Sequence, residues 1–489
     1  MKIKNATLFF IICSLFIISC DSDTKTQKGI ISGVITLDGQ QDYSGIRVML
    51  YSADIVPGKL KELNDQYQQL AFPVEDKHIF DHRKFSPLFS VFTNKKGFFS
   101  FPETVYGKYI ITYLKEGWGY NYIYDIELHS SEYNTNSIYI YRDLSLSPLL
   151  IVPSVLENDY IFYSDKCYYF PQNTMAFPVA KVTIEPSAKL LLGEGIEFSI
   201  YGELEICDGS NFAIMTSFSN IYETGVNSSK LGQRVIIYGT ANKISNLRVS
   251  YLNSGLDIRA ENQILRNASL CYNGTAMIAY QTANVTLSNS LIYANTNSEY
   301  ASIIAYNVNG YNAINNIFYQ NNISIRNKTL TNSTIRNNVF YGGNTEVENA
   351  FNSNCLFEHN IINNVGIGLD NTAQSNLEVN YNDITANVCI YNWFFPNVGN
   401  SPNEGWVQGT NNNFNAFRYT VESRAAYFLI SSDLLLDFRN NYWGTTSETE
   451  IENKIIDSYD LGVPGGDYYW SIVNYKPYQH NRIISAGIK

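Results

Sequence analysis

A repeat of about 22 residues runs through the second half of the chain and constrains its fold more than any other feature. Three apolar columns share this period. The first holds Val249, Leu270, Leu291, Phe318, Phe340, Ile362 and Ile384, with a longer gap between Leu291 and Phe318 than between the other neighbours. The second holds Leu256, Met277, Ile325, Val347 and Leu369, and the third holds Ile244, Leu265, Ile335, Phe357 and Val379. Several columns with one period predict a solenoid of stacked repeats.

Asparagines recur in phase with these columns. One set is Asn246, Asn267, Asn289, Asn316, Asn338, Asn360 and Asn382, and a second is Asn327, Asn349 and Asn371. Equivalent residues of stacked coils lie about 4.8 Å apart. Asparagine tolerates the left-handed backbone of a tight corner, and its amide can hydrogen-bond to the asparagines above and below. We therefore predict a structural asparagine ladder.

A leucine-rich repeat has a period in the same range. It would place leucine at several fixed positions and add a helical or compact segment. Here the inward positions mix Val, Ile, Phe and Leu, and the remainder is rich in poor helix formers such as Asn, Thr, Ser and Gly. Short parallel strands fit better.

The repeat resembles the right-handed parallel β-helix of the pectate-lyase-like fold, over residues 155–437 with a loop at about 395–425. Residues 182–206 are similar to the opening coils of surface proteins with this fold. The motif Phe438-Arg-Asn-Asn-Tyr-Trp-Gly-Thr-Thr446 is similar to their closing coil, so we expect 438–489 to form a C-terminal cap with a short helix and strand. Such caps cover strand edges that would otherwise be unpaired.

Before the repeat lies a smaller unit, at residues 29–130. Alternating runs such as Tyr43–Tyr51 and Phe89–Phe101, broken by Asp-Gly, Ser-Gly and Asn-Lys-Lys-Gly turns, predict short antiparallel strands. Their order resembles the carboxypeptidase regulatory-like domain, a transthyretin-like β-sandwich that is usually a spacer or binding module. An insertion at about 54–87 departs from that pattern, and 131–154 would connect the two units. The predicted fold class is all-β.

The first twenty residues have the features of a targeting signal. Lys2 and Lys4 precede an apolar run too short to span a bilayer as a helix, and the run ends at Ser19-Cys20 before a polar linker at 21–28. This resembles a bacterial lipobox, which implies lipid attachment at Cys20 and a location outside the cytoplasm, at the outer membrane or cell surface. The alternative is an ordinary cleaved signal peptide with a chance cysteine.

The net charge of −11, without a basic run beyond the N-terminus, argues against a nucleic-acid partner. Apart from Cys13 and Cys20, five cysteines remain at wide, irregular spacing, which predicts free thiols and not disulfides or a zinc site. His78 and His82, near Asp76 and Asp81, have metal-ligand spacing on a helix. Because Pro73 and Pro87 bracket them and no third ligand is evident, we expect a solvated loop and no metal site.

No catalytic residues are predicted. Asp257, Arg326, Glu348 and Asp370 share one phase, and Arg336 and Glu358 form a similar pair, but an exposed charge ladder is structural by default. Enzymes of the resembling fold include polysaccharide lyases and glycoside hydrolases, which need paired carboxylates or, commonly, Ca²⁺. We therefore expect no cofactor, with Ca²⁺ relevant only if the protein is such an enzyme.

Tyr319 and Tyr341 follow inward phenylalanines in successive coils, so they should point outward and stack. A row of tyrosines is a candidate platform for sugar rings. The leading hypothesis is a lipid-anchored cell-envelope protein that binds a polysaccharide or envelope glycan without catalysis. A surface-anchored polysaccharide lyase or hydrolase is the alternative, and a purely structural envelope component is a third.

Overall fold

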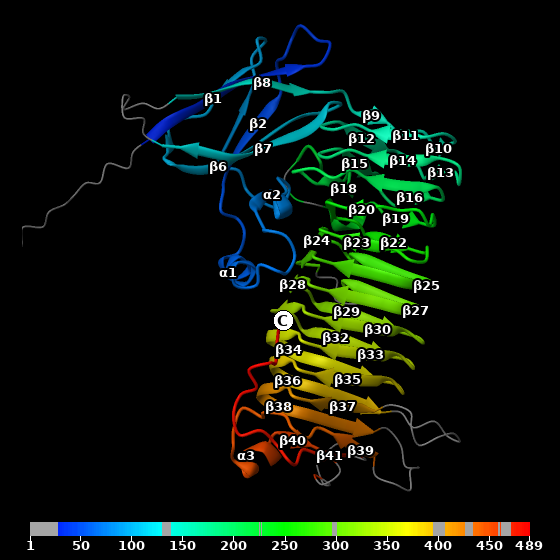
Figure 1. The fold of residues 1–489 in the computed structure, drawn as a ribbon. Helices are drawn as coiled ribbons and strands as arrows, with labels where there is room; N and C mark the ends of the chain where they lie inside the picture. The colour runs from blue at the N-terminus through cyan, green and yellow to red at the C-terminus, as the bar shows by residue number, and fades with distance from the viewer. Residues whose placement is uncertain are drawn as a thin grey trace, which may run out of the picture.

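The computed structural model describes residues 28–129, 138–223, 225, 227–295, 301–394, 406–425, 434–457, 460 and 471–489. It is all-β, with 52% strand and 5% helix. Small sheets at the N-terminus precede a right-handed parallel β-helix of about 11 turns with coils of about 22 residues (Figure 1). The predicted fold class is confirmed. Cys20 lies outside the described residues.

The N-terminal unit is a sandwich of two four-stranded sheets. One sheet contains β1 (Lys28–Leu37), β4 (Phe98–Ser100), β5 (Thr104–Val105) and β8 (Ile138–Leu146). The other contains β2 (Arg47–Ser52), β3 (Phe89–Phe92), β6 (Gly107–Lys115) and β7 (Gly119–Leu128). Alternating apolar residues of both sheets, among them Ile35, Val48 and Ile111, form the core between them. The β1–β8 pair is parallel, and it extends the sandwich past residue 130 to Leu146.

The solenoid has three sheets, which we name by what lies outside them. The covered sheet comprises β9 (Leu150–Ile151), β12 (Cys167–Phe170), β15 (Lys189–Leu192), β18 (Ala213–Ser217), β21 (Leu247–Ser250), β24 (Ser269–Cys271), β26 (Leu291–Tyr293), β28 (Ile317–Tyr319) and β31 (Val339–Tyr341). The open sheet comprises β10 (Val155–Leu156), β13 (Thr174–Ala176), β16 (Glu197–Ile200), β19 (Arg234–Ile237), β22 (Leu256–Ile258), β29 (Ile323–Lys328), β32 (Thr345–Ala350) and β40 (Ile455–Ile456).

The third sheet comprises β11 (Tyr160–Phe162), β14 (Lys181–Ile184), β17 (Glu203–Ile206), β20 (Ile244–Ser245), β23 (Ile264–Arg266), β30 (Asn332–Arg336), β33 (Asn354–Glu358), β35 (Asn376–Asn380), β37 (Val407–Thr410), β39 (Leu434–Asp437) and β41 (Ser471–Asn474). Five long strands turn a corner between sheets: β25 (Met277–Ser288), β27 (Ile303–Ile314), β34 (Ile361–Thr372), β36 (Asp383–Phe394) and β38 (Asn413–Ala425). Strands β37 and β38 occupy 407–425, so the loop predicted at 395–425 is shorter than expected.

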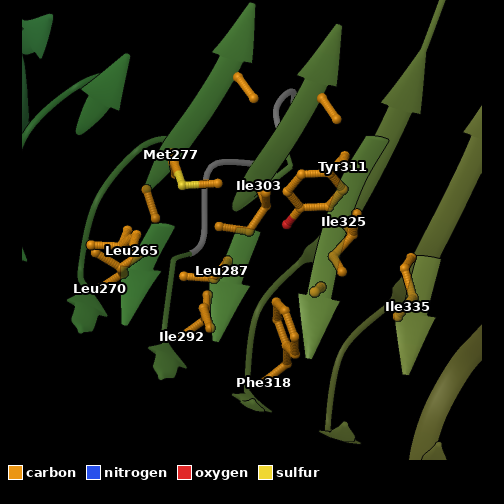
Figure 2. Close-up of a cluster of buried hydrophobic side chains, with 14 of the residues drawn as sticks. Leu265, Leu270, Met277, Leu287, Ile292, Ile303, Tyr311, Phe318, Ile325 and Ile335 are labelled. Atoms are coloured by element: carbon orange, nitrogen blue, oxygen red, sulfur yellow. The ribbon is translucent and has the colours of Figure 1, made fainter. Parts of the chain in front are cut away.

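Inward residues of successive coils stack in files, as the repeat predicts. Phe318 pairs with Phe340, then Ile362, then Ile384, and the two phenyl rings stack at 4.6 Å and 13°. The alignment is wrong at Leu291, because Leu270 pairs with the next residue, Ile292, which faces the core (Figure 2). Leu291 and Ile292 are both apolar, so composition does not reveal which of them points inward.

The predicted asparagine column contains two different positions. Asn246, Asn267 and Asn289 have φ near +50° and serve as left-handed corners. One position later, the side-chain amides form a buried ladder: each backbone N–H donates to Oδ1 of the next coil's asparagine, at 2.7–2.9 Å, through Ser290, Asn316, Asn338, Asn360, Asn382, Asn412 and Asn441. Asparagine is favoured at both positions, so the sequence prediction treated the two positions as a single column.

The second asparagine set is also a ladder. Asn349 Nδ2 donates to Asn371 Oδ1 at 2.9 Å, and Asn371 donates to Asn392 at 3.0 Å, while Asn327 donates to the hydroxyl of Ser333. At the closing end, buried Trp443, helix α3 (Glu448–Glu452) and the β39–β41 pair form the predicted cap. The cysteines that the structure describes are free thiols, as expected: Cys167, Cys207, Cys271, Cys355 and Cys389.

The insertion at 54–87 contains α1 (Gly58–Gln66) and α2 (Asp76–Ile79), and it runs down the outside of the covered sheet (Figure 1). Leu60, Leu63 and Leu70 pack against the outward side chains of β26, β28 and β31. The C-terminal residues lie on the same side, where Arg482 pairs with Asp383. In the described residues, the insertion and the C-terminal segment thus cover one sheet, whereas the open sheet and the third sheet, with exposed Asn332 and Arg336, face solvent.

Candidate functional site

A file of aromatic and cationic side chains runs along the outer face of the open sheet. We call it the tyrosine–arginine file, made of Tyr201, Tyr238, Arg259, Tyr280, Tyr306 and Lys328. Tyr280 pairs with Tyr306, and Tyr306 with Lys328. Tyr201, Tyr238, Arg259 and Tyr280 directly follow Ile200, Ile237, Ile258 and Ala279, which pair in this order. The file therefore crosses six consecutive coils.

The rings of the file stack along the solenoid axis. Tyr201 and Tyr238 lie 4.4 Å apart at 3°, and Tyr280 and Tyr306 lie 5.1 Å apart at 16°. The Arg259 guanidinium fills the coil between the pairs, 5.6 Å from the Tyr238 ring and 5.2 Å from the Tyr280 ring. Because the ring faces contact one another, the file presents ring edges, hydroxyls and a guanidinium to solvent.

An ion network holds Arg259 in this position. Its guanidinium donates to both oxygens of Asp257, which also accepts from Arg234 at 3.0 Å. Arg234 in turn donates to Glu197 at 2.8 Å. The hydrogen bonds that Arg259 donates to the Asp257 carboxylate raise the pKa of Arg259. Two cations and two anions leave the network neutral, and the Asp257 side chain is only 1% exposed.

Sequence reasoning missed this file, because its spacings are irregular. Loops lengthen the coil between Tyr201 and Tyr238 and the coil between Tyr280 and Tyr306, so the members do not recur at one interval. The file could have been found from the residue that follows each inward apolar position. Inward Ile200, Ile237 and Ile258 are followed by members of the file. A search at a single fixed period does not align these residues.

A charged column lies beside the file on the same face. Arg326 pairs with Glu348, and Glu348 with Asp370, as the sequence predicted, with an Arg326–Glu348 distance of 2.7 Å. The column is not the exposed ladder expected, because its three side chains are only partly exposed and Oδ1 of Asp370 is buried. Burial and then the charge of Glu348 raise the pKa of Asp370 to about 7.

Tyr319 and Tyr341 stack as predicted, at 5.4 Å and 9°. They do not form an open platform, because they belong to the covered sheet and the insertion packs on them. Tyr319 is 3% exposed, and Lys59 of α1 lies 5.8 Å from the Tyr341 ring. The sequence does not show that the insertion folds back over coils that lie far along the chain.

The insertion is not the solvated loop expected around His78 and His82. Asp81 accepts two hydrogen bonds from Arg83 at 2.9 Å, and Arg83 also donates to the Ser217 carbonyl of the solenoid at 2.7 Å. His82 bonds to the Ile221 carbonyl and to the Tyr122 hydroxyl. Burial lowers the pKa of His78 to about 3 and of His82 to about 4, so both are neutral. These residues attach the insertion and the sandwich to the solenoid.

Within the described ranges, no group of three or more His, Cys, Asp or Glu side chains is placed to hold a metal ion. In the same residues, none of the helices has the length and apolar character of a membrane span. Comparisons of the chain with protein-family models, with curated proteins and with solved structures found no match. The assignment of the candidate site therefore rests on its geometry alone.

A buried carboxyl beneath the open sheet gives a pH-dependent prediction. Glu346 is 1% exposed and accepts hydrogen bonds from the Ser324 hydroxyl and the Gly343 N–H. Burial raises its pKa from 4.5 to about 7. The folded protein therefore prefers the protonated acid, and the stability this contributes is present below about pH 4.5 and lost as the pH rises through about 7.

Because glutamine resembles the protonated acid, we expect Glu346→Gln to be more stable than the parent at pH 8, by about 3 kcal/mol. Urea unfolding between pH 5 and pH 8 should show this difference shrinking toward pH 5. Glu358→Gln, at a partly exposed carboxyl paired with Arg336, is the control and should change stability by less than about 1 kcal/mol. A Glu346→Gln protein that is less stable by the same amount at every pH would contradict the assignment.

Proposed function

We propose that the protein is a cell-envelope protein that binds a glycan chain along the tyrosine–arginine file. The observation that supports this most is the continuity of the file over six coils. A polymer with a repeating unit can contact equivalent groups on successive coils, which recur about every 4.8 Å. Neither the insertion nor the C-terminal segment packs on these side chains in the described residues.

The chemistry of the file suits a hydroxyl-rich ligand. Tyrosine hydroxyls donate and accept hydrogen bonds, and a guanidinium donates in a fixed planar geometry. Tyrosine and arginine are also the residues that dominate the energy of binding interfaces. Since the ion network around Arg259 is neutral, the file does not favour a highly charged polyanion such as nucleic acid.

The anchoring part of the proposal rests on the sequence. The segment ending at Cys20 resembles a lipobox, and lipid at Cys20 would hold the protein at a membrane outside the cytoplasm. The sandwich, which resembles a carboxypeptidase regulatory-like domain, would then act as a spacer between the lipid and the solenoid. The extended solenoid would present the open sheet away from the membrane.

One observation favours a polysaccharide-cleaving enzyme as a second candidate. Glu348 is paired with Arg326, while neighbouring Asp370 has its pKa raised to about 7. A carboxyl with a raised pKa beside a second carboxyl is the arrangement that general acid–base cleavage of a glycosidic bond requires. In this reading, Asp370 would be the acid and the file would hold the substrate.

The binding proposal predicts that soluble neutral or acidic polysaccharides retard the protein in affinity electrophoresis. Removing the rings on both sides of Arg259, with Tyr238→Ala and Tyr280→Ala together, should weaken the retarding interaction at least tenfold, by analogy with interface hot spots. Tyr163→Ala is the matched control, because Tyr163 is 54% exposed and lies outside the file. Circular dichroism should show both variants folded.

Absence of retardation by every polysaccharide, or retardation that the double variant leaves unchanged, would overturn the proposal. New reducing ends or unsaturated products, released by the parent protein and abolished by Asp370→Asn, would instead establish the enzyme candidate. Both readouts come from the same incubations.

Lipid anchoring is tested separately. In a bacterial host, the full chain should incorporate a labelled fatty acid and partition with membranes, whereas Cys20→Ala should do neither. Cys13→Ala, inside the signal segment, is the control and should keep the label. Equal labelling of the Cys20→Ala protein and the parent would refute the lipobox assignment.

A further inference from the structure

A second candidate binding site lies away from the open sheet, in a cavity of about 340 Å³ between the sandwich and the first coils of the covered sheet. Strands β6 and β7 contribute Tyr113, Asn121, Tyr122 and Tyr124, and the solenoid contributes Lys189, Ile214 and Arg248. The volume is within the range of small-molecule sites, which often lie where two domains meet. This cavity shares no residue with the tyrosine–arginine file.

Lys189 brings a buried ammonium to the cavity. It is 2% exposed, and its Nζ donates to the Asn121 side chain and to the Ser187 carbonyl, each at 3.2 Å. An ammonium has three N–H donors, so one makes no hydrogen bond to the described residues, and the Tyr120 ring lies 5.6 Å from Nζ. Among the described residues no carboxylate forms an ion pair with it. A buried cation without an anionic partner is costly, and a bound anion would reduce that cost.

Arg248 brings a second buried cation. It is 1% exposed, donates to the Phe80 carbonyl, and lies 3.5 Å from Asp81. Its Nε is buried and has no hydrogen-bond partner in the part of the chain that the structure describes. Asp81 also accepts two hydrogen bonds from Arg83, so a single carboxylate is shared by the guanidinium groups of Arg83 and Arg248. The buried cluster beside the cavity therefore carries excess positive charge.

The rest of the cavity lining is uncharged on one side and carries both acidic and basic side chains at the rim. Tyrosine rings of β6 and β7 offer apolar faces, and hydroxyl and amide groups offer hydrogen bonds: Ser145, Ser147, Ser164, Ser187, Asn121 and Asn211. At the rim, Lys77 and Lys166 pair with Glu75 and Asp38, and Asp143 and Asp165 add two carboxylates to the lining. A ligand that fits has an anionic group for the buried cations, hydroxyls for the polar lining and a compact ring for the tyrosines.

We propose that this cavity binds an acidic monosaccharide, with its carboxylate or phosphate group at Lys189 and Arg248 and its ring against the tyrosines of β6 and β7. The ligand contacts both the sandwich and the solenoid, so its binding also stabilises their attachment. Either anionic group satisfies the same two donors. Glucuronate and glucose 6-phosphate distinguish these two groups, and glucose is the uncharged reference.

Isothermal titration of the full chain with these three sugars tests the proposal. At least one acidic sugar should bind with one-to-one stoichiometry and at least tenfold more tightly than glucose. Lys189→Met should weaken this binding by about 10- to 100-fold, the usual effect of losing a charged hydrogen bond. Lys181→Met, on the preceding strand β14 of the third sheet and outside the cavity, is the matched control and should bind as the parent does.

Asn121→Asp is a second variant in case Lys189→Met does not fold. It places a carboxylate beside the Lys189 ammonium, so it should weaken binding of the acidic sugar and leave glucose unaffected. Equal affinity for glucose and both acids, no detectable binding, or parent-like affinity in Asn121→Asp would overturn the proposal. The Tyr238→Ala/Tyr280→Ala protein should bind the acidic sugar normally, which separates this result from the fate of the glycan proposal.

Discussion

From Ser290 to Asn441, the solenoid depends on a hydrogen bond that joins each coil to the next at a buried corner. A backbone N–H of one coil donates to the side-chain oxygen of an asparagine in the following coil, as in Asn316 to Asn338 and Asn338 to Asn360. The side-chain amides of these asparagines also donate to backbone carbonyls of the preceding coil, as Asn360 does to Ile335. Since each buried amide is satisfied only in one register, a slip between coils would leave polar groups unpaired in the core.

That register determines the functional surface. When inward side chains stack in files, the outward ones must stack too, so a tyrosine or arginine that follows an inward residue joins a continuous file. The ion pairs follow the same rule, as Arg326 with Glu348 shows. Along the opposite side, buried Arg83 and Asp81 attach the insertion to the covered sheet. Among the described residues, the covered sheet is thus closed by the insertion, whereas the open sheet and the third sheet face solvent.

Much of the solenoid could be predicted from the sequence, because period and side-chain type carry the information. The file from Phe318 to Ile384 is correct, and the closing segment contains the expected short helix and strand. Errors arose where neighbouring residues are chemically alike, as at Leu291 and Ile292, or where two adjacent positions both favour asparagine. The candidate site was less accessible to prediction: Tyr319 is buried by a segment distant in sequence, and loops of unequal length obscure the spacing of Tyr201, Tyr238 and Tyr280.

The central claim is that buried amide bonds between coils set the register, and urea unfolding of two alanine variants tests it most directly. Asn360→Ala removes the acceptor of the Asn338 N–H and the donor to Ile335, so the account predicts a loss of about 2 to 4 kcal/mol. Asn354→Ala interrupts a similar but exposed amide ladder and should cost less than about 0.5 kcal/mol. Equal, small losses in both proteins would contradict the claim.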